Sequence, residues 1–237
     1  MNTSLQAALD LMRPEPSILR PTAASRIYDD LRQRILSLDL PPGTNLLRAE
    51  LAKEYEVSQT PLRDALQRLD QDGLVKIYPQ SRTLVTRIDV PQLNEALFLR
   101  RALETEVVLG LARTKVPETV VRARAVIAMQ RAVAEEGTQL RKFQQLDEYF
   151  HFILFEGLGR EALHALLRSR SGHLDRVRRL QRHSEEKLQQ ILQGHTAIID
   201  AIEAGDEARA IHEIRDHTYK PEDWADEYRI LHKDYFA

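Results

Sequence analysis

Two short helical patterns lie close together in the first third of the chain and leave little choice of fold there. Apolar residues at helical spacing predict helices over 48–55 and about 60–72, separated by Glu56-Val57-Ser58. A short helix, a tight turn and a second helix are typical of a helix-turn-helix unit. Two β-favouring runs, 74–78 and 83–86, follow around a polar turn and predict a two-stranded wing.

The sequence predicts helices in the rest of the chain. An earlier helix is predicted over about 23–38, and residues 1–22, with three prolines, are expected to form a mobile tail. From Pro91 onward only helical periods occur, broken at Gly and Pro positions. We therefore expect a mainly α protein: a winged helix-turn-helix domain with a small two-stranded β wing over 23–88, and an all-α antiparallel bundle of about six helices over 91–237, ending in a kinked extension from Pro221.

Composition narrows the classes of function. The 237 residues are 43% hydrophobic and 30% charged, which is typical of a globular protein. There is no cysteine, so disulfides, thiolate metal sites and cysteine nucleophiles are excluded. No apolar run approaches the roughly 20 residues that span a bilayer. We expect a cytoplasmic protein that has no membrane partner.

The second helix of the helix-turn-helix has a polar face suited to DNA. Leu62, Ala65, Leu66 and Leu69 form its inward stripe. Arg binds guanine and Gln binds adenine through paired hydrogen bonds, while Ser and Thr at a helix start bind phosphate. An ordinary solvated face would look similar. The candidate DNA-binding residues, including two from neighbouring segments, are Ser58, Gln59, Thr60, Arg63, Arg68, Arg48 and Arg82.

Polar residues also lie within apolar helical stripes of the C-terminal half, where an unpaired charge is costly. Asp147 and His151 are one turn apart on the helix near 139–156, His195 is central on the helix near 184–204, and His217 is near the inward edge of the last one. One carboxylate and three imidazoles suit a divalent metal: zinc first, with nickel or manganese as alternatives. Satisfied core histidines and a buried hydrogen-bonded pair are the other interpretation.

Arg100 and Glu104 also share an apolar stripe, with Leu93, Leu97 and Val108. A guanidinium pairs with a carboxylate through two parallel hydrogen bonds, so Arg100, together with Glu104, is a candidate for binding a small organic acid that also contacts the metal. An internal ion pair between Arg100 and Glu104 is the alternative.

These motifs resemble those of a known family. Leu51-Ala52, the run from Val57 to Leu69, and Asp72-Gly73-Leu74-Val75 are similar to the DNA-binding signature of the GntR family. Asp147-x-x-x-His151 with His195 and His217 resembles the metal-binding pattern of its FadR-type effector domain, called FCD, and Arg100-x-x-x-Glu104 resembles that domain's opening motif. The resemblance implies a homodimeric transcriptional repressor that binds a palindromic double-stranded operator, with Arg63 matching a base-contacting arginine, and is controlled by a small carboxylic acid.

The chain departs from the family pattern in the DNA-binding half. Gln59 stands where Arg is usual, Arg48 precedes Ala49 where an acidic-then-basic pair is common, and the wing turn from Gln80 to Thr83 lacks its usual Gly. A change from Arg to Gln shifts base preference from guanine toward adenine or removes a contact, which is worth ~1 to 3 kcal/mol per base pair.

Two other functions fit parts of the sequence. A helical-bundle metalloenzyme is suggested by Glu148-x-x-His151 and Glu161-x-x-His164. Those pairs are close in sequence across a Gly-rich break, and such an enzyme needs no helix-turn-helix, so we expect no enzyme. The second alternative is a DNA-binding regulator whose C-terminal domain only dimerises and binds no metal.

Overall fold

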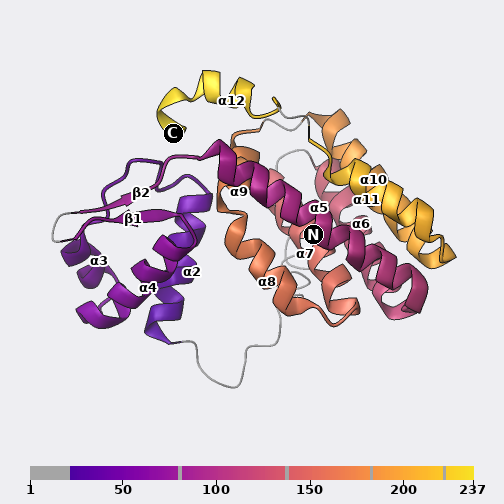
Figure 1. Ribbon diagram of the computed structural model, residues 1–237, viewed down its shortest axis with the longest axis horizontal. Coiled ribbons are helices and arrows are strands. Elements are labelled where there is room, and N and C mark those ends of the chain that lie inside the picture. The colour runs from indigo at the N-terminus through magenta and orange to yellow at the C-terminus, as the bar shows by residue number, and fades with distance from the viewer. Residues whose placement is uncertain (1–21, 80–81, 137–138, 182–183, 221–222) are drawn as a thin grey trace. The chain divides into compact units, whose positions relative to one another are not determined.

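The computed structural model describes residues 22–79, 82–136, 139–181, 184–220 and 223–237. In the N-terminal part, helices α2 (Ala23–Leu36), α3 (Arg48–Glu54) and α4 (Gln59–Gln71) precede strands β1 (Val75–Ile77) and β2 (Thr83–Val85) (Figure 1). The strands pair antiparallel in the register Val75 with Val85 and Ile77 with Thr83. The predicted winged helix-turn-helix is confirmed.

The core of this part follows the predicted stripes. Leu62, Ala65, Leu66 and Leu69 are buried on one face of α4, which packs against α2 and β1. Burying that face holds α4 in place and leaves its opposite face to solvent. The backbone of Glu56 adopts a positive φ of 52°, which makes the tight turn between α3 and α4.

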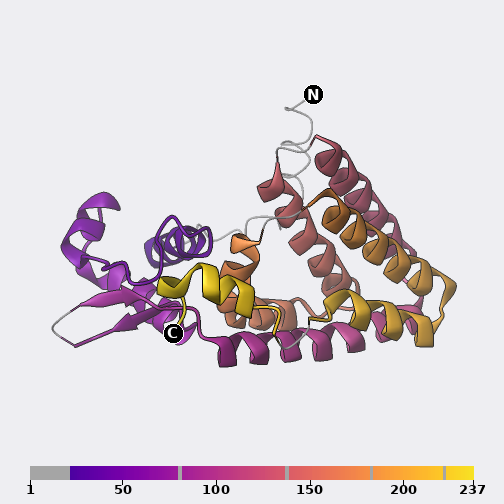
Figure 2. The ribbon, with the colours of Figure 1, turned by 90° about the horizontal axis from the view of Figure 1, so that it is seen from above.

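The C-terminal part is helical throughout its described residues. Its elements are α5 (Val90–Thr114), α6 (Pro117–Glu135), α7 (Leu140–Gly157), α8 (Glu161–Arg170), α9 (Gly172–Leu180), α10 (Glu185–Ala204), α11 (Glu207–Thr218), α12 (Asp226–Leu231) and the 3-10 helix η1 (Lys233–Tyr235). Helix α6 packs against α7 and α10, and α10 packs against α11 (Figure 2). None of the described helices is long and apolar enough to cross a membrane.

The breaks between these helices lie where the sequence predicts them. Pro117 opens α6, where a missing N–H is tolerated. Gly205 ends α10 at φ 72°, a left-handed conformation that favours glycine. Asp206 then caps α11 by accepting the N–H of Arg209 at 3.0 Å. A short turn thus links α10 to α11, and these two helices carry two of the candidate metal ligands.

The chain divides into two compact units. Among the described elements, one unit comprises α6, α7, α10 and α11 with most of α5 and α8. The other comprises α2 to α4, the sheet, α9, α12 and η1. The expected domain limits, 23–88 and 91–237, stay predictions. The expected tail 1–22, apart from Thr22, and the wing-turn residues Gln80 and Ser81 lie outside the described residues.

Hydrogen bonds explain why α9 and the C-terminal segment belong to the same compact unit as the winged helix. Arg176 on α9 is fully buried and donates to the carbonyl oxygen of Thr86 at 2.6 Å. The N–H of Ile88 donates to the carbonyl oxygen of Tyr235 at 2.7 Å. The segment that follows β2 is therefore contacted by both α9 and the end of the chain.

Candidate metal centre and nucleic-acid interface

The exposed face of α4 carries the predicted DNA-binding side chains. Ser58 precedes the helix, and Gln59, Thr60 and Arg63 are exposed on its first turns. The Arg63 side chain is 64% exposed, and its Nε lies 4.0 Å from Asp64 Oδ1. A surface pair at that distance is weak, so the guanidinium can exchange it for a nucleic-acid contact.

The other three candidate arginines contact the protein itself. The Arg68 guanidinium lies 3.9 Å from the centre of the Tyr28 ring. Arg48 Nη2 donates to Thr83 Oγ1 at 3.4 Å, and the Arg82 guanidinium lies over the ring of Tyr78. These contacts hold the arginines on the surface of the winged helix. A role of any of the three in DNA binding stays a prediction.

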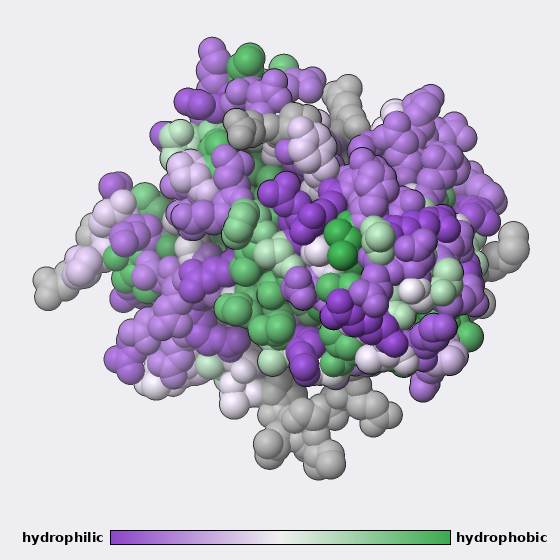
Figure 3. Space-filling model, turned by 45° about the vertical axis from the view of Figure 1, so that its right-hand side comes forward, coloured by the Kyte–Doolittle hydropathy of each residue, from purple (hydrophilic) through white to green (hydrophobic). Residues whose placement is uncertain are grey.

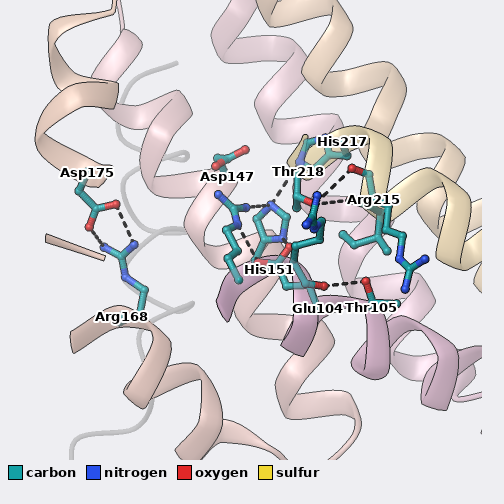
Figure 4. Close-up of polar contacts among 12 residues, drawn as sticks. Glu104, Thr105, Asp147, His151, Arg168, Asp175, Arg215, His217 and Thr218 are labelled. Atoms are coloured by element: carbon teal, nitrogen blue, oxygen red, sulfur yellow. Dashed lines mark hydrogen bonds and ion pairs between the residues drawn. The ribbon is translucent and has the colours of Figure 1, made fainter. Parts of the chain in front are cut away.

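The four predicted metal ligands come together inside the helical unit. Asp147 and His151 project from α7, His195 from α10 and His217 from α11, and one ligand atom from each lies within 4.8 Å of all the others. Asp147, His151 and His195 are buried, and His217 is partly exposed. Figure 4 shows the side chains of Asp147, His151 and His217 in one region, with Glu104 beside His151.

Two short separations define the centre of this cluster. His217 Nε2 lies 3.4 Å from His151 Nε2, and His195 Nε2 lies 3.4 Å from Asp147 Oδ1. The His195 ring also stacks on Phe150, with centroids 3.9 Å apart. A methyl group at Gly194 would lie 2.7 Å from His217 Nδ1, so the absence of a side chain there lets the His217 ring lie against α10.

Burial keeps these imidazoles in the form that binds metals. Burial lowers the pKa of His195 to about 4, against the opposing effect of Asp147. Burial and then the neighbouring imidazoles hold the pKa of His217 well below its usual value. Both rings are therefore neutral at pH 7, and a neutral imidazole offers one nitrogen lone pair to an ion.

The donor set fits a divalent ion. Zinc binds nitrogen and oxygen at about 2.0–2.2 Å, so two ligands of one ion are at most about 4.2 Å apart. The cluster spans 4.8 Å and needs only a small contraction. Arg100 Nη2 lies 2.7 Å from His151 Nε2, so an ion on that nitrogen requires the guanidinium to move. A bound ion would act here as a Lewis acid with open positions for ligand oxygen.

Arg100 and Glu104 form the ion pair that was the alternative to ligand binding. Arg100 Nε donates to Glu104 Oε1 at 2.9 Å, and His151 Nδ1 lies 3.2 Å from Glu104 Oε2. Burial acts to raise the pKa of Glu104, but Arg100 and His151 outweigh it and lower that pKa to about 2. The Glu104 carboxylate thus backs His151, as carboxylates often do for metal-binding histidines.

Sequence reasoning missed one partner of the cluster. Gln130 on α6 is fully buried, and its Oε1 lies 2.9 Å from His195 Nδ1. A signal was present, because Gln130 lies within the buried apolar stripe of Val126, Ile127 and Val133. A polar residue in such a stripe indicates a buried hydrogen bond.

Comparison with known proteins shows the family. Residues 23–85 match the family described as bacterial regulatory proteins, gntR family, and residues 95–219 match the FCD domain. The chain belongs to the GntR family. It is a DNA-binding transcriptional regulator and not an enzyme. The residues of the predicted signature and of the cluster lie within these two matched regions.

Two GntR-family relatives and one structure show how far the likeness extends. An uncharacterized HTH-type transcriptional regulator of Streptomyces ambofaciens is 35% identical over 81% of this chain and 80% of its own length. The HTH-type transcriptional repressor RspR of Escherichia coli is 26% identical over 92% of this chain and 96% of its own length. The structure of E. coli McbR/YncC covers 91% of this chain and all of its own, with a TM-score of 0.71 at 17% identity, which shows a shared fold.

The geometry agrees with the exclusion of a di-iron enzyme. His151 belongs to the Asp147 cluster, whereas His164 packs edge-on against Phe152 and Phe155 at 5.3 Å. Over the described parts of the chain, His164 is not among the residues grouped as a possible metal site. The second Glu-x-x-His unit therefore adds no ligand to the first.

Proposed function

We propose that this protein is a repressor controlled by a small carboxylic acid that binds at a metal site in the C-terminal domain. The observation that carries the proposal is the buried cluster of Asp147, His151, His195 and His217, with ligand atoms within 4.8 Å of one another. One carboxylate and three imidazoles whose ligand atoms converge form a donor set that suits a divalent ion, which would bind all four groups at once. Zinc is the first candidate, with nickel and manganese as alternatives.

The effector proposal rests on Arg100. Its side chain is 11% exposed, and its guanidinium reaches the edge of the cluster at His151. Glu104 accepts from Nε, so when the guanidinium moves off His151 Nε2 to admit the ion, its other N–H groups stay beside the cluster. A small carboxylate would bind the ion through one oxygen and Arg100 through the other.

The DNA proposal assigns base contacts to the start of α4. Arg63 and Gln59 reach base edges in the major groove, and Ser58 and Thr60 bind phosphate. Arg48, Arg68 and Arg82 supply further phosphate contacts from the same surface. A palindromic operator presents two equivalent half-sites, so two copies of α4 are needed, as in a homodimer.

A groove along α5 and α11 is the surface that we assign to the second copy. It has a volume of about 860 Å³, and its lining combines apolar residues with Arg101, Arg215, Glu106 and Asp216. A two-fold contact places one patch against itself, so a patch with both signs of charge can complement its own copy. Phe98, which lines the groove, is 67% exposed. Hydrophilic residues cover much of the face shown in Figure 3, around a hydrophobic patch near its centre.

We assign repression rather than activation, because the relative RspR is named a repressor. An effector changes operator occupancy only if it binds the DNA-competent and DNA-incompetent states with different affinities. Helix α5 carries Arg100 and Glu104 and begins at Val90, directly after the winged-helix segment. When the effector displaces the Arg100 side chain, it therefore acts on the helix that directly follows the DNA-binding part of the chain.

The test is the metal content of the purified, untagged protein, measured by elemental mass spectrometry beside Asp147→Ala. We expect close to one zinc, nickel or manganese ion per chain in the wild type and loss of it in the variant. Circular dichroism of both proteins controls for folding. The absence of metal from both, even after metal is added back, would sink the proposal and favour a C-terminal domain that only dimerises.

A further inference from the structure

Gln130 is a buried amide directed at one metal-ligand candidate. It is 0% exposed and lies 65 residues from His195 in sequence, yet its Oε1 is 2.9 Å from His195 Nδ1. Its neighbours on the buried face of α6 are apolar. A buried polar group without a partner costs free energy, and the contact with His195 is the one that satisfies the amide oxygen, while Gln130 Nε2 has no hydrogen-bond partner among the described residues.

The chemistry of the amide oxygen decides where the His195 proton sits. A neutral imidazole has one N–H donor and one lone pair, and a carbonyl oxygen only accepts. With Gln130 Oε1 toward the ring, as in this structure, His195 Nδ1 carries the proton and Nε2 carries the lone pair. That lone pair faces Asp147 Oδ1 at 3.4 Å, so two acceptor atoms point at a common space. A cation between them satisfies both.

His151 is oriented by a different kind of group. Its Nδ1 lies 3.2 Å from the carboxylate oxygen Glu104 Oε2, and its Nε2 faces His217. Both rings thus present Nε2 to the cluster and Nδ1 to a supporting acceptor. In one case the acceptor is charged and in the other it is neutral, so Gln130 orients His195 without adding negative charge.

We propose that Gln130 is a positioning residue that keeps the His195 proton on Nδ1 and thereby presents the Nε2 lone pair to a divalent ion. The inference rests on the proposed metal function. Partners of this kind fix the tautomer and ring orientation of metal-binding histidines, and their loss weakens metal binding by about 10- to 100-fold. Gln130 does not itself bind the ion.

The experiment compares Gln130→Met, Gln130→Glu and the wild type in the full-length protein. Met has the length of Gln without an acceptor, and Glu restores the acceptor. Zinc affinity is measured by competition with a chromophoric chelator, and the His195 tautomer is read from ¹⁵N chemical shifts of zinc-stripped protein. We expect Gln130→Met to bind zinc about 10- to 100-fold more weakly, with the proton moved to Nε2, where Asp147 accepts it. Gln130→Glu should keep the proton on Nδ1 and bind zinc at least as well as the wild type.

Ile127→Met is the matched control, because it changes a buried residue on the same face of α6 and leaves the His195 partners intact. It should change neither measurement. An unchanged His195 tautomer in Gln130→Met would overturn the inference, even if zinc affinity falls, since the loss would then come from packing. If the wild type binds no metal, the proposed function fails, but the tautomers of the zinc-stripped proteins still decide the role of Gln130.

Discussion

The buried His173 imidazole accepts a hydrogen bond from the backbone N–H of Asp89 through Nδ1, at 3.0 Å. Arg176 Nη2 lies at the same distance from that nitrogen. Burial, followed by the charge of Arg176, lowers the pKa of His173 to about 4. The ring is thus neutral in the folded protein over a pH range in which an exposed histidine becomes protonated.

This environment predicts that stability falls as the solution becomes acidic. Between pH 6.5 and 4 the unfolded chain binds a proton at His173 that the folded chain does not, so the stabilisation present above pH 6.5 is lost as pH falls toward 4. From pH 7 to 5 this residue should cost about 2 kcal/mol. Urea unfolding at both pH values, followed through the single tryptophan, Trp224, in the same compact unit, measures the loss.

The variant His173→Gln should show a smaller difference in unfolding free energy between pH 7 and 5 than the wild type. His232→Gln, which changes a partly exposed histidine of the same compact unit that does not line the groove along α5 and α11, is the control and should leave that difference unchanged. Equal pH dependence in His173→Gln and the wild type would show that His173 titrates normally in the folded protein.

Among the elements, the C-terminal segment makes a contact that predicts a local effect. The side chain of Phe236 is 3% exposed, and the backbone on either side of it pairs with Ile88. Phe236→Ala removes a buried aromatic ring, a change that costs about 3–5 kcal/mol in a protein core. We expect faster hydrogen exchange at the Ile88 amide, because its acceptor, Tyr235, loses its support. Ile230→Ala, in the same segment at 68% exposure, should not alter that exchange; equal exchange in both variants would contradict a structural role for Phe236.

Local patterns predicted most elements and few of the long-range contacts. The helices and the wing follow from apolar spacing and from breaks such as Pro117 and Gly205, because both signals lie within a few residues. The pairing of Ile88 with the end of the chain joins distant residues and has no local pattern. The burial of Arg176 could not be predicted for another reason. Periodicity assigns arginine to the surface, whereas backbone and hydroxyl oxygens accept hydrogen bonds from this guanidinium inside the fold.

The candidate site was predictable to the extent that its ligands lie on helical stripes. Asp147 and His151 are one turn apart on α7, and His195 and His217 lie on inward-facing positions, so convergence could be expected from spacing. The supporting groups were harder to assign. Glu104, a candidate for effector binding, lies 3.2 Å from His151 Nδ1, a contact between residues of α5 and α7 that no local pattern indicates.

At the scale of the whole molecule, the sequence assigns different tasks to residues far apart in the chain. Arg63 lies on α4 in one compact unit, and His195 lies on α10 in the other. Substitutions at such distant and independent sites are additive in most proteins. Phe98 lines the groove along α5 and α11, to which we assign a third proposed task, self-association.

Three variants should therefore each lose a different property. Arg63→Ala should weaken operator binding by about 1–3 kcal/mol per half-site and keep its metal, because one base contact is removed from each half-site. His195→Ala should lose metal and effector response and keep operator binding. Phe98→Asp should shift the dimer toward monomer in analytical ultracentrifugation and keep its metal, because a charge enters an apolar contact. Operator titration and elemental analysis on all three proteins complete the test. If Arg63→Ala lost metal or His195→Ala lost operator binding, the two tasks would share one structural element and the proposed separation would be wrong.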